Sequence, residues 1–368
     1  MLAPLFKRDS KALLRTARGR LVADFLAGSW RPLPSVMHNS TQDLDEIAPL
    51  LMRSGCGSLA WSRIRQSGLQ SSAVARRFQQ AYRLHSLQAA LHRRNLKRVI
   101  SFLRSLDLEP LLVKGWAIAR HYAEPGMRPY GDIDLCVSQD QYARAREALK
   151  SPDIQECNVD LHEGFGKFYD RNTDDVFARS QLIKLDDLDV RVLSREDDLR
   201  FLCLHLLRHG AVRPLWLCDI AVLLETQPAE FDWDLCLSGS RRQADWVSCT
   251  IELTHRLLGG KSKHGPTSHR AQKLPKWLLS TVLKEWGAPF KFPGQIAVYL
   301  RHPFRLAGSL LKELPDHWPN PIEATMTLKG PINELPRLPF QIGHVFSRTA
   351  ALLPHLPSIV GSLVDRRS

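Results

Sequence analysis

Two carboxylates with the spacing of one strand face lie in a short apolar segment of this chain. Asp132 and Asp134 begin the run Asp132-Ile-Asp-Leu-Cys-Val137, which follows Gly131. In a strand, side chains two residues apart point to the same face, so both carboxylates share one side. Adjacent carboxylates repel each other, and Mg²⁺ relieves that repulsion by binding their oxygens. The spacing therefore predicts a metal site.

Context separates this pair from other aspartates with the same spacing. Three further pairs occur: Asp43/Asp45, Asp187/Asp189 and Asp232/Asp234. The first and last open predicted helices, where acids favour the positive end of the helix dipole. The middle pair lies at a predicted hairpin turn. Only Asp132/Asp134 lies in an apolar strand, where an unpaired buried charge would cost about 3–5 kcal/mol.

A third carboxylate follows on another predicted strand, Asn158 to Phe165. Asp160 and His162 are two residues apart there and share a face. If this strand pairs beside Asp132 and Asp134, the three carboxylates can hold two Mg²⁺ ions, the arrangement that promotes in-line phosphoryl displacement. His162 is explained equally well as a hydrogen-bonded strand histidine and as a functional residue.

A lysine and a glycine lie between a short apolar run, 111–113, and a helix-like segment, Trp116 to Ala123. Gly115 lets backbone amides approach a ligand, and a helix N-terminus favours phosphate. Lys114 or Arg128 would add positive charge. Beside a metal site, this turn is a candidate binding site for the triphosphate of a nucleotide.

Polar residues in the second half of the chain have structural interpretations. His205 and His209 share a helix face but lack a third ligand, so a zinc site is not predicted. Asp219 lies in an apolar helix and needs a partner, which His205, His209, Arg208 or Arg213 could supply. We interpret Asp219 first as a structural bridge within a helical domain and second as a substrate contact.

The elements that carry these residues divide the chain into five regions. They are a helical N-terminal region (1–105), an α/β core (106–193), a helical domain (194–258), a basic linker (259–273) and a Pro-rich helical C-terminal region (274–368). Strand signals concentrate in 106–193, where apolar and polar residues alternate. Ser194-Arg-Glu-Asp197 resembles a capping box and predicts a helix that starts there.

Composition limits the partners and the compartment. The 368 residues include 51 Lys and Arg against 38 Asp and Glu, and the net charge of +13 suits nucleotide phosphates, nucleic acid or an anionic membrane face. Seven scattered cysteines without a Cys-x-x-Cys pair predict buried thiols in the cytoplasm. Charges follow the first apolar residues, the reverse of a secretory signal, and no apolar stretch suggests a membrane span.

The order of these residues resembles a known family, the uncharacterised nucleotidyltransferases of the DNA polymerase β-like superfamily. The matching residues extend over about residues 80 to 230: Val113-Lys114-Gly115, Tyr122, Arg128-Pro129, Asp132 to Val137, Val159 to His162, Leu204-His205 and Trp216 to Asp219. Two positions differ from the usual pattern. The broader superfamily has Gly-Ser where this chain has Lys114-Gly115, so we do not expect a serine to bind phosphate at this position. The second difference is Cys136, which replaces a leucine.

The resemblance implies an α+β fold, with a small mixed nucleotidyltransferase sheet, flanking helices and a mostly helical domain after it. It implies that Asp132 and Asp134 are metal ligands. Asp160 would be either a third ligand or the base that accepts the proton of an attacking hydroxyl. From the residues themselves, and not from the resemblance, we expect the nucleotide to be bound through Lys114-Gly115, Arg128 and His162.

These observations lead to the hypothesis of a Mg²⁺-dependent transferase. It would move a nucleoside monophosphate from an NTP, such as ATP, to a hydroxyl-bearing small molecule, peptide or protein and release pyrophosphate. One alternative is a toxin–antitoxin type transferase that adenylylates a protein. Another is a non-catalytic module whose basic surface binds RNA or an anionic membrane, although nucleic acid is not specifically indicated and the intact Asp132, Asp134 and Asp160 argue against loss of activity.

Overall fold

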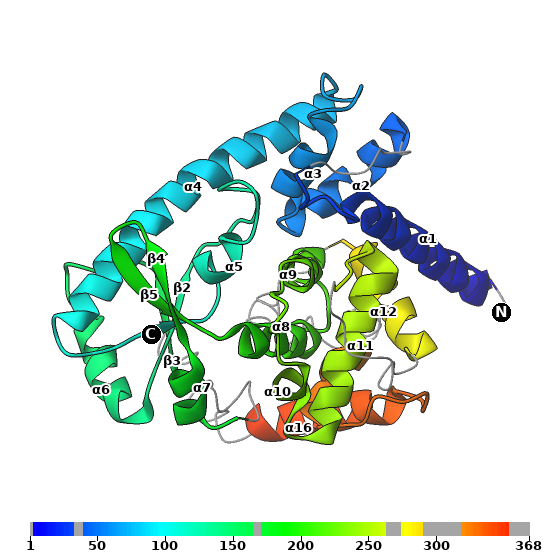
Figure 1. Ribbon diagram of the computed structural model, residues 1–368. Coiled ribbons are helices and arrows are strands. Elements are labelled where there is room, and N and C mark those ends of the chain that lie inside the picture. Colours follow the sequence, from blue (N-terminus) through cyan, green and yellow to red (C-terminus); the bar gives the residue numbers. More distant parts are fainter. Residues whose placement is uncertain (1–2, 33–39, 165–170, 263–273, 290–317, 353–368) are drawn as a thin grey trace, which may run out of the picture.

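The computed structural model describes residues 3–32, 40–164, 171–262, 274–289 and 318–352. A mixed sheet lies at one side of the molecule, and helices from both ends of the chain form the other side (Figure 1). This arrangement confirms the predicted α+β class.

The sheet contains both parallel and antiparallel neighbours. Its strands in the described residues are β1 (Leu111–Leu112), β2 (Ile133–Val137), β3 (Val159–Glu163), β4 (Gln181–Leu185) and β5 (Leu188–Val192), in the order β3-β2-β1-β5-β4. β2 pairs parallel with β3, and β1 pairs parallel with β5, whereas β1/β2 and β4/β5 are antiparallel. Asp186 turns the predicted β4–β5 hairpin with φ +58°, a conformation that aspartate tolerates.

Two helices cover one face of the sheet: α4 (Ala73–Arg104) and α6 (Gln139–Ala148) (Figure 1). Ile133, Leu135 and Val137 of β2 are buried in the same apolar cluster as Leu103 of α4. Because side chains alternate along a strand, Asp134 must point to the opposite face. That face is turned toward the helical part of the molecule.

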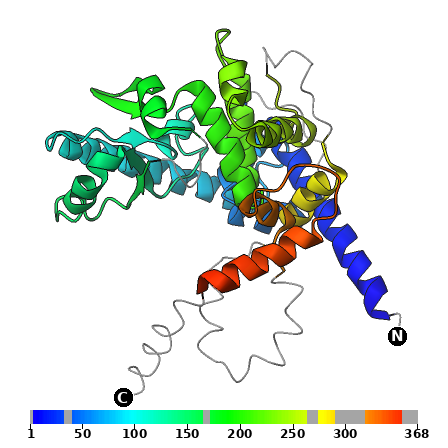
Figure 2. The ribbon, with the colours of Figure 1, turned by 90° about the horizontal axis from the view of Figure 1, so that it is seen from below.

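The remaining helices occupy the two ends of the chain and the loops of the sheet. α1 (Ala3–Leu26), α2 (Thr41–Arg53) and α3 (Gly57–Ile64) precede α4, and α5 (Trp116–Ala119) and α7 (Thr173–Arg179) lie between strands. The helices after the sheet are α8 (Arg195–Arg208), α9 (Pro214–Glu225), α10 (Trp233–Leu237), α11 (Arg241–Leu258), α12 (Lys276–Trp286), α15 (Pro321–Thr327) and α16 (Leu338–Leu352). In a view from below, the start of α1 projects beyond the other helices (Figure 2).

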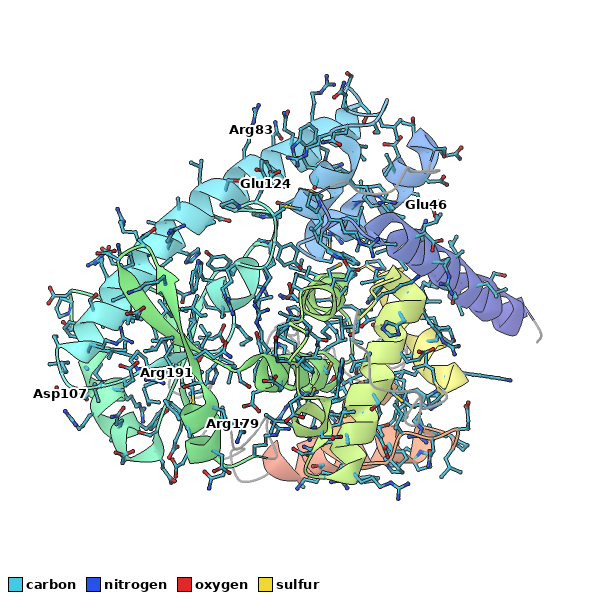
Figure 3. The ribbon with its side chains drawn as sticks, viewed as in Figure 1. Glu46, Arg83, Asp107, Glu124, Arg179 and Arg191 are labelled. Atoms are coloured by element: carbon cyan, nitrogen blue, oxygen red, sulfur yellow. The ribbon has the colours of Figure 1, made fainter. Side chains whose placement is uncertain are left out.

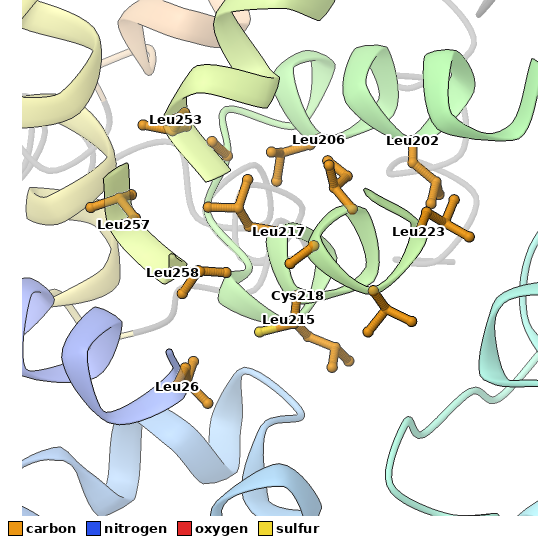
Figure 4. Packing of buried hydrophobic residues seen from close by; sticks show 14 of the residues in the cluster. Leu26, Leu202, Leu206, Leu215, Leu217, Cys218, Leu223, Leu253, Leu257 and Leu258 are labelled. Carbon is orange, nitrogen blue, oxygen red and sulfur yellow. The ribbon is translucent and has the colours of Figure 1, made fainter. Parts of the chain in front are cut away.

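The N-terminal helices and the helices after the sheet share one hydrophobic core. Leu26 of α1 lies in the same cluster as Leu206 of α8, Leu217 of α9 and Leu257 of α11 (Figure 4). All four side chains are nearly or fully buried. The two ends of the chain are therefore packed together around α8 and α9.

Local signals explain where several helices begin. Ser194 caps α8 by accepting a hydrogen bond from the Asp197 N–H, as the capping pattern predicts. Pro214 occupies the first turn of α9, where its missing N–H costs nothing. The expected helix from Trp116 to Ala123 is wrong in length, because α5 ends at Ala119. The next three residues form tight turns that direct Tyr122 into the core.

Part of the predicted linker and C-terminal region lies outside the described residues, namely 263–273, 290–317 and 353–368. Within the described residues of 274–368, α12, α15 and α16 agree with the predicted helical character. No helix in the described ranges combines the length and apolar character needed to cross a bilayer.

Candidate functional site

The parallel pairing of β2 with β3 brings the candidate residues together. Asp134 lies opposite Asp160 in the register, and Cys136 lies opposite His162. Adjacent strands are about 4.8 Å apart, so side chains at paired positions are neighbours on one face. The condition under which Asp160 joins Asp132 and Asp134, namely that the two strands pair, is therefore met.

Asp134, Asp160 and His162 form a compact group of possible metal ligands. Their ligand atoms all lie within 4.8 Å of one another, and His162 Nε2 is 3.4 Å from both Asp134 Oδ1 and Asp160 Oδ2. The Asp134 side chain is only 3% exposed, whereas that of Asp160 is 56% exposed. The group thus extends from the buried Asp134 to the solvent-exposed Asp160.

Lys114 places a positive charge on the buried aspartate. Its Nζ is 2.6 Å from Asp134 Oδ1, and the preceding Val113 N–H donates to the Asp134 carbonyl. Burial favours the neutral form of Asp134, but the hydrogen bond with His162 and the Lys114 charge outweigh it and lower the pKa of this carboxyl. Asp134 is therefore an anion that already binds one cation, the lysine ammonium.

The donor set fits a divalent cation. The carboxylate oxygens of Asp134 and Asp160 are the type of ligand that Mg²⁺ and Mn²⁺ prefer, and His162 adds a nitrogen that suits Mn²⁺ better than Mg²⁺. Lys114 would have to give up its contact with Asp134 for a metal to bind there. The group is thus compatible with the predicted metal, with Asp134 and Asp160 as its carboxylates.

Asp132 lies at the entrance of the site, one residue before β2. Partial burial and the neighbouring Asp134 raise the pKa of Asp132. Its oxygens are not among the ligand atoms that converge within 4.8 Å. Its role as a metal ligand therefore remains a prediction that requires its side chain to turn toward Asp134.

Gly115 is held in a conformation that other residues rarely adopt. Its φ is +63° and its ψ is −117°, and an added Cβ would lie 3.4 Å from the Asp132 carbonyl oxygen. The Lys114-Gly115 turn thus packs directly against the strand of aspartates. Because α5 has only four residues, its dipole is small. The Ala117 and Ile118 N–H groups already donate to the Lys114 and Gly115 carbonyls, so the turn offers a phosphate mainly the Lys114 charge.

Arg128 is paired with Asp219, which corrects the predicted partners of that aspartate. Arg128 Nη2 is 2.8 Å from Asp219 Oδ2, and Arg128 Nε is 3.2 Å from Asp219 Oδ1. The Tyr122 hydroxyl donates to the same Oδ1 at 2.7 Å. The expectation that a histidine or arginine of the helical domain binds Asp219 is wrong, because both partners come from the loop between α5 and β2. The proposed role of Arg128 in nucleotide binding remains a prediction.

Asp219 therefore links two parts of the protein instead of bridging within one. It is fully buried in α9, and Arg128 is 7% exposed. Arg128 precedes Asp132 by four residues, so the pair anchors the loop that leads into the site. Sequence spacing could not reveal this contact, since the residues are 91 positions apart.

His205 of α8 forms a wall of the site beside Lys114, a role that sequence reasoning missed. A small cavity beside the site is lined by Lys114, His162, Phe201 and His205, among others. The His205 ring lies 5.7 Å from that of Phe201 and 4.7 Å from that of Trp216. Burial, followed by the nearby Lys114 charge, lowers the pKa of His205 well below its usual range, so its ring is neutral.

Comparison with known proteins agrees with this geometry. A family model described as "Uncharacterised nucleotidyltransferase" matches residues 40–158 and 151–259. The matches together extend over more than half of the 368 residues. The chain belongs to this nucleotidyltransferase family. No curated protein and no solved structure matches it.

The extent of the match shows what the nucleotidyltransferase unit includes. It begins at α2 and ends just after α11, so it contains the sheet and the helices α8 and α9 that follow it. Every residue of the site described above lies inside it. The motifs recognised in the sequence cover a shorter segment, from about residue 80 to 230.

Proposed function

We propose that this protein is a Mg²⁺-dependent nucleotidyltransferase that transfers a nucleoside monophosphate from an NTP to an acceptor hydroxyl. The acceptor oxygen would form a bond to the α-phosphorus, the bond to the bridging oxygen of the β-phosphate would break, and pyrophosphate would leave. The observation that carries this proposal is the convergence of Asp134, Asp160 and His162 on paired strands beside Lys114.

Lys114 and the adjacent turn would bind the triphosphate. The Lys114 ammonium would exchange its contact with Asp134 for a phosphate oxygen when the site binds substrate. Gly115 has no side chain, so the backbone before α5 could approach a phosphate closely. His162, whose side chain is 28% exposed, would donate to a phosphate oxygen, and Arg128 would add positive charge.

The carboxylates would have separate tasks. Mg²⁺ bound at Asp134 and Asp160, with Asp132 as a further ligand, would neutralise phosphate charge during transfer. Asp160 has the most exposed side chain of the three converging residues. It is therefore placed where an acceptor would approach and could accept the hydroxyl proton if it is not needed as a ligand.

Thermal-shift and isothermal titration measurements with Mg²⁺ and each of the four NTPs test this proposal. We expect at least one NTP to bind in a Mg²⁺-dependent manner, and Asp160→Asn to weaken that binding at least about tenfold, since one charged ligand is lost. Asp160 is exposed, so this variant should fold. Asp187→Asn is the matched control, because Asp187 is an exposed aspartate on the β4–β5 hairpin.

A second measurement follows the reaction itself. NTP labelled at the α-phosphate should transfer its label to an acceptor in a cell extract, with release of pyrophosphate, and Asp134→Asn should abolish the transfer. Absence of any NTP effect on wild-type protein, or equal NTP binding by Asp160→Asn and the Asp187→Asn control, would refute the proposal.

A further inference from the structure

The long helix α4 has an outer face that carries a line of exposed leucines. Leu84, Leu87 and Leu91 are 54%, 72% and 46% exposed. They are spaced by three and four residues, so they follow one another along one side of the helix. Figure 1 shows α4 running along the edge of the molecule, and Figure 3 shows Arg83 on its outer side. The leucines therefore form an apolar line on an open surface.

Positive charge surrounds this line. Three exposed arginines lie on the same side of the helix as the leucines: Arg76, Arg83 and Arg94. The ion pairs of α4 in the described part of the chain are formed instead by Arg93, Lys97 and Arg104. The whole helix contains eight Arg and Lys and no Asp or Glu. The outer face of α4 thus carries charge that the described residues do not compensate.

The shape of this outer face fits a single helix. At about 100° per residue, the three leucines span about 60° of the helix circumference. A helix that packs on a domain core has an apolar stripe of about 100° or more, whereas a narrower line with spacings of three and four is the seam of a coiled coil. Arg76 and Arg94 are about 27 Å apart along the axis, so positive charge lies at both ends of the seam.

The combination of leucines and arginines favours one class of partner. A second copy of this chain would bring the same arginines together, and they would repel each other. A nucleic acid would neutralise the arginines but would not cover the leucines with apolar surface. A bilayer binds a helix in proportion to the apolar area that it buries, and three leucines offer little. An acidic helix matches both features, because its carboxylates reach the arginines while its apolar residues cover the leucines.

We propose that the outer face of α4, with the three leucines and three arginines named above, binds an acidic amphipathic helix of a partner protein. Apolar residues of that helix would pack on the line of leucines, and its Asp and Glu side chains would pair with the arginines. This interaction is independent of the proposed nucleotidyl transfer, because none of these six side chains belongs to the site at Asp134.

Fluorescence anisotropy with labelled synthetic peptides and the full-length protein tests the proposal. The probe is a peptide of three heptads with Leu at positions a and d and Glu at positions e and g. One comparison peptide has Lys at e and g, and the other keeps Glu there but has Ala at a and d, which preserves helix propensity. We expect the probe to bind at least about tenfold more tightly than either comparison peptide, and to bind more weakly as the salt concentration rises.

Variants then locate the binding on α4. Leu87→Gln should weaken the probe at least about tenfold, the effect of losing one well-covered leucine. Leu13→Gln is the matched control, because Leu13 of α1 is 71% exposed and Leu87 is 72% exposed. Arg83→Gln combined with Arg94→Gln should weaken the probe about fivefold at low salt, and Arg242→Gln, at an exposed arginine of α11, should leave it unchanged. All five side chains are exposed, so these variants should fold.

Several results would overturn the proposal. They are that the probe does not bind, that either comparison peptide binds as tightly as the probe, or that Leu87→Gln binds the probe as tightly as Leu13→Gln. Phosphatidylglycerol vesicles and an RNA duplex are titrated in the same way. Binding of either one that Leu87→Gln weakens, without binding of the probe, would assign this face to a different class of partner and would also overturn the proposal.

Discussion

Replacing Asp219 by asparagine removes one charge from the buried contact between α9 and the loop that leads to the aspartates. Arg128 would keep its guanidinium in a position that is 7% exposed, without a counter-ion. Loss of one partner from a buried ion pair costs about 3–5 kcal/mol, because the other charge is left unpaired. Asparagine has nearly the same shape, so a cavity adds little, and we expect the free energy of unfolding to fall by that amount.

A more exposed pair in the same region supplies the control. Arg65 and Glu124 form two hydrogen bonds, but their side chains are 25% and 32% exposed. Figure 3 shows Glu124 beside α4, in the loop that also carries Arg128. Water can solvate these charges, so Glu124→Gln should cost about 1 kcal/mol or less. Both variants exchange a carboxylate for an amide, and only burial differs.

An apolar replacement of the whole network separates charge from packing. The triple variant Tyr122→Phe/Arg128→Met/Asp219→Leu removes both charges and the tyrosine hydroxyl together, so no charge is left unpaired. It frees only the part-buried Pro129 carbonyl, to which Arg128 Nη1 donates at 3.3 Å. Replacement of a buried ion pair by apolar residues of similar volume is often neutral. The triple variant should therefore be more stable than Asp219→Asn, although it changes three residues.

Urea unfolding followed by circular dichroism and tryptophan fluorescence measures these differences. The explanation is refuted if Asp219→Asn loses no more stability than Glu124→Gln. It is also refuted if the triple variant is as unstable as Asp219→Asn, because the cost would then come from packing and not from an unpaired charge.

Other predictions concern a helix contact, a buried acid and the thiols. Gly19→Ala would place a Cβ 1.9 Å from the Leu283 carbonyl oxygen, so α1 and α12 must separate, and the free energy of unfolding in urea should fall by about 1–3 kcal/mol. In the control Gly68→Ala the new Cβ has no atom within 4 Å, so the free energy of unfolding should change by no more than about 0.5 kcal/mol. Equal losses in the two variants would contradict this packing. Burial raises the pKa of Asp198 from 3.8 to about 8. The folded state therefore binds this proton more tightly than the unfolded state, and the contribution of Asp198 to the free energy of unfolding falls as the pH rises from about 4 to about 8. Asp198→Asn should flatten the pH dependence of the unfolding free energy, and an unchanged slope would contradict the assignment. All seven cysteines are buried, so native protein should react with Ellman's reagent only after unfolding, and a rapidly reacting thiol would show that one of them is accessible.

Local patterns predicted several elements correctly because they act over a few residues. Alternation identified β2 and β3. The cap at Ser194 was also correct, since a side chain and an N–H three residues later decide it. The same reasoning overestimated the helix after Gly115, because propensity does not register that Tyr122 must turn inward to reach Asp219.

The candidate site also combines residues that the sequence identified with contacts that only the folded chain creates. Residue type and spacing identified Asp134, Asp160, His162 and Lys114 as possible functional residues. Their convergence depended on the parallel register of β2 and β3, which the sequence suggested only as a condition. The wall formed by His205 was not foreseen, because packing of α8 against the sheet places it there.

The sequence by itself determined the strands, the helices, the aspartate spacing and the resemblance to a nucleotidyltransferase. The first three depend on neighbours within one turn or one strand, where chain geometry sets the period. The resemblance depends on the order of motifs over about residues 80 to 230. Tertiary structure alone decided that Lys114 neutralises Asp134 and that Arg128 pairs with Asp219. Those contacts join segments up to 91 residues apart, and a buried charge takes whichever partner the folded chain brings within reach.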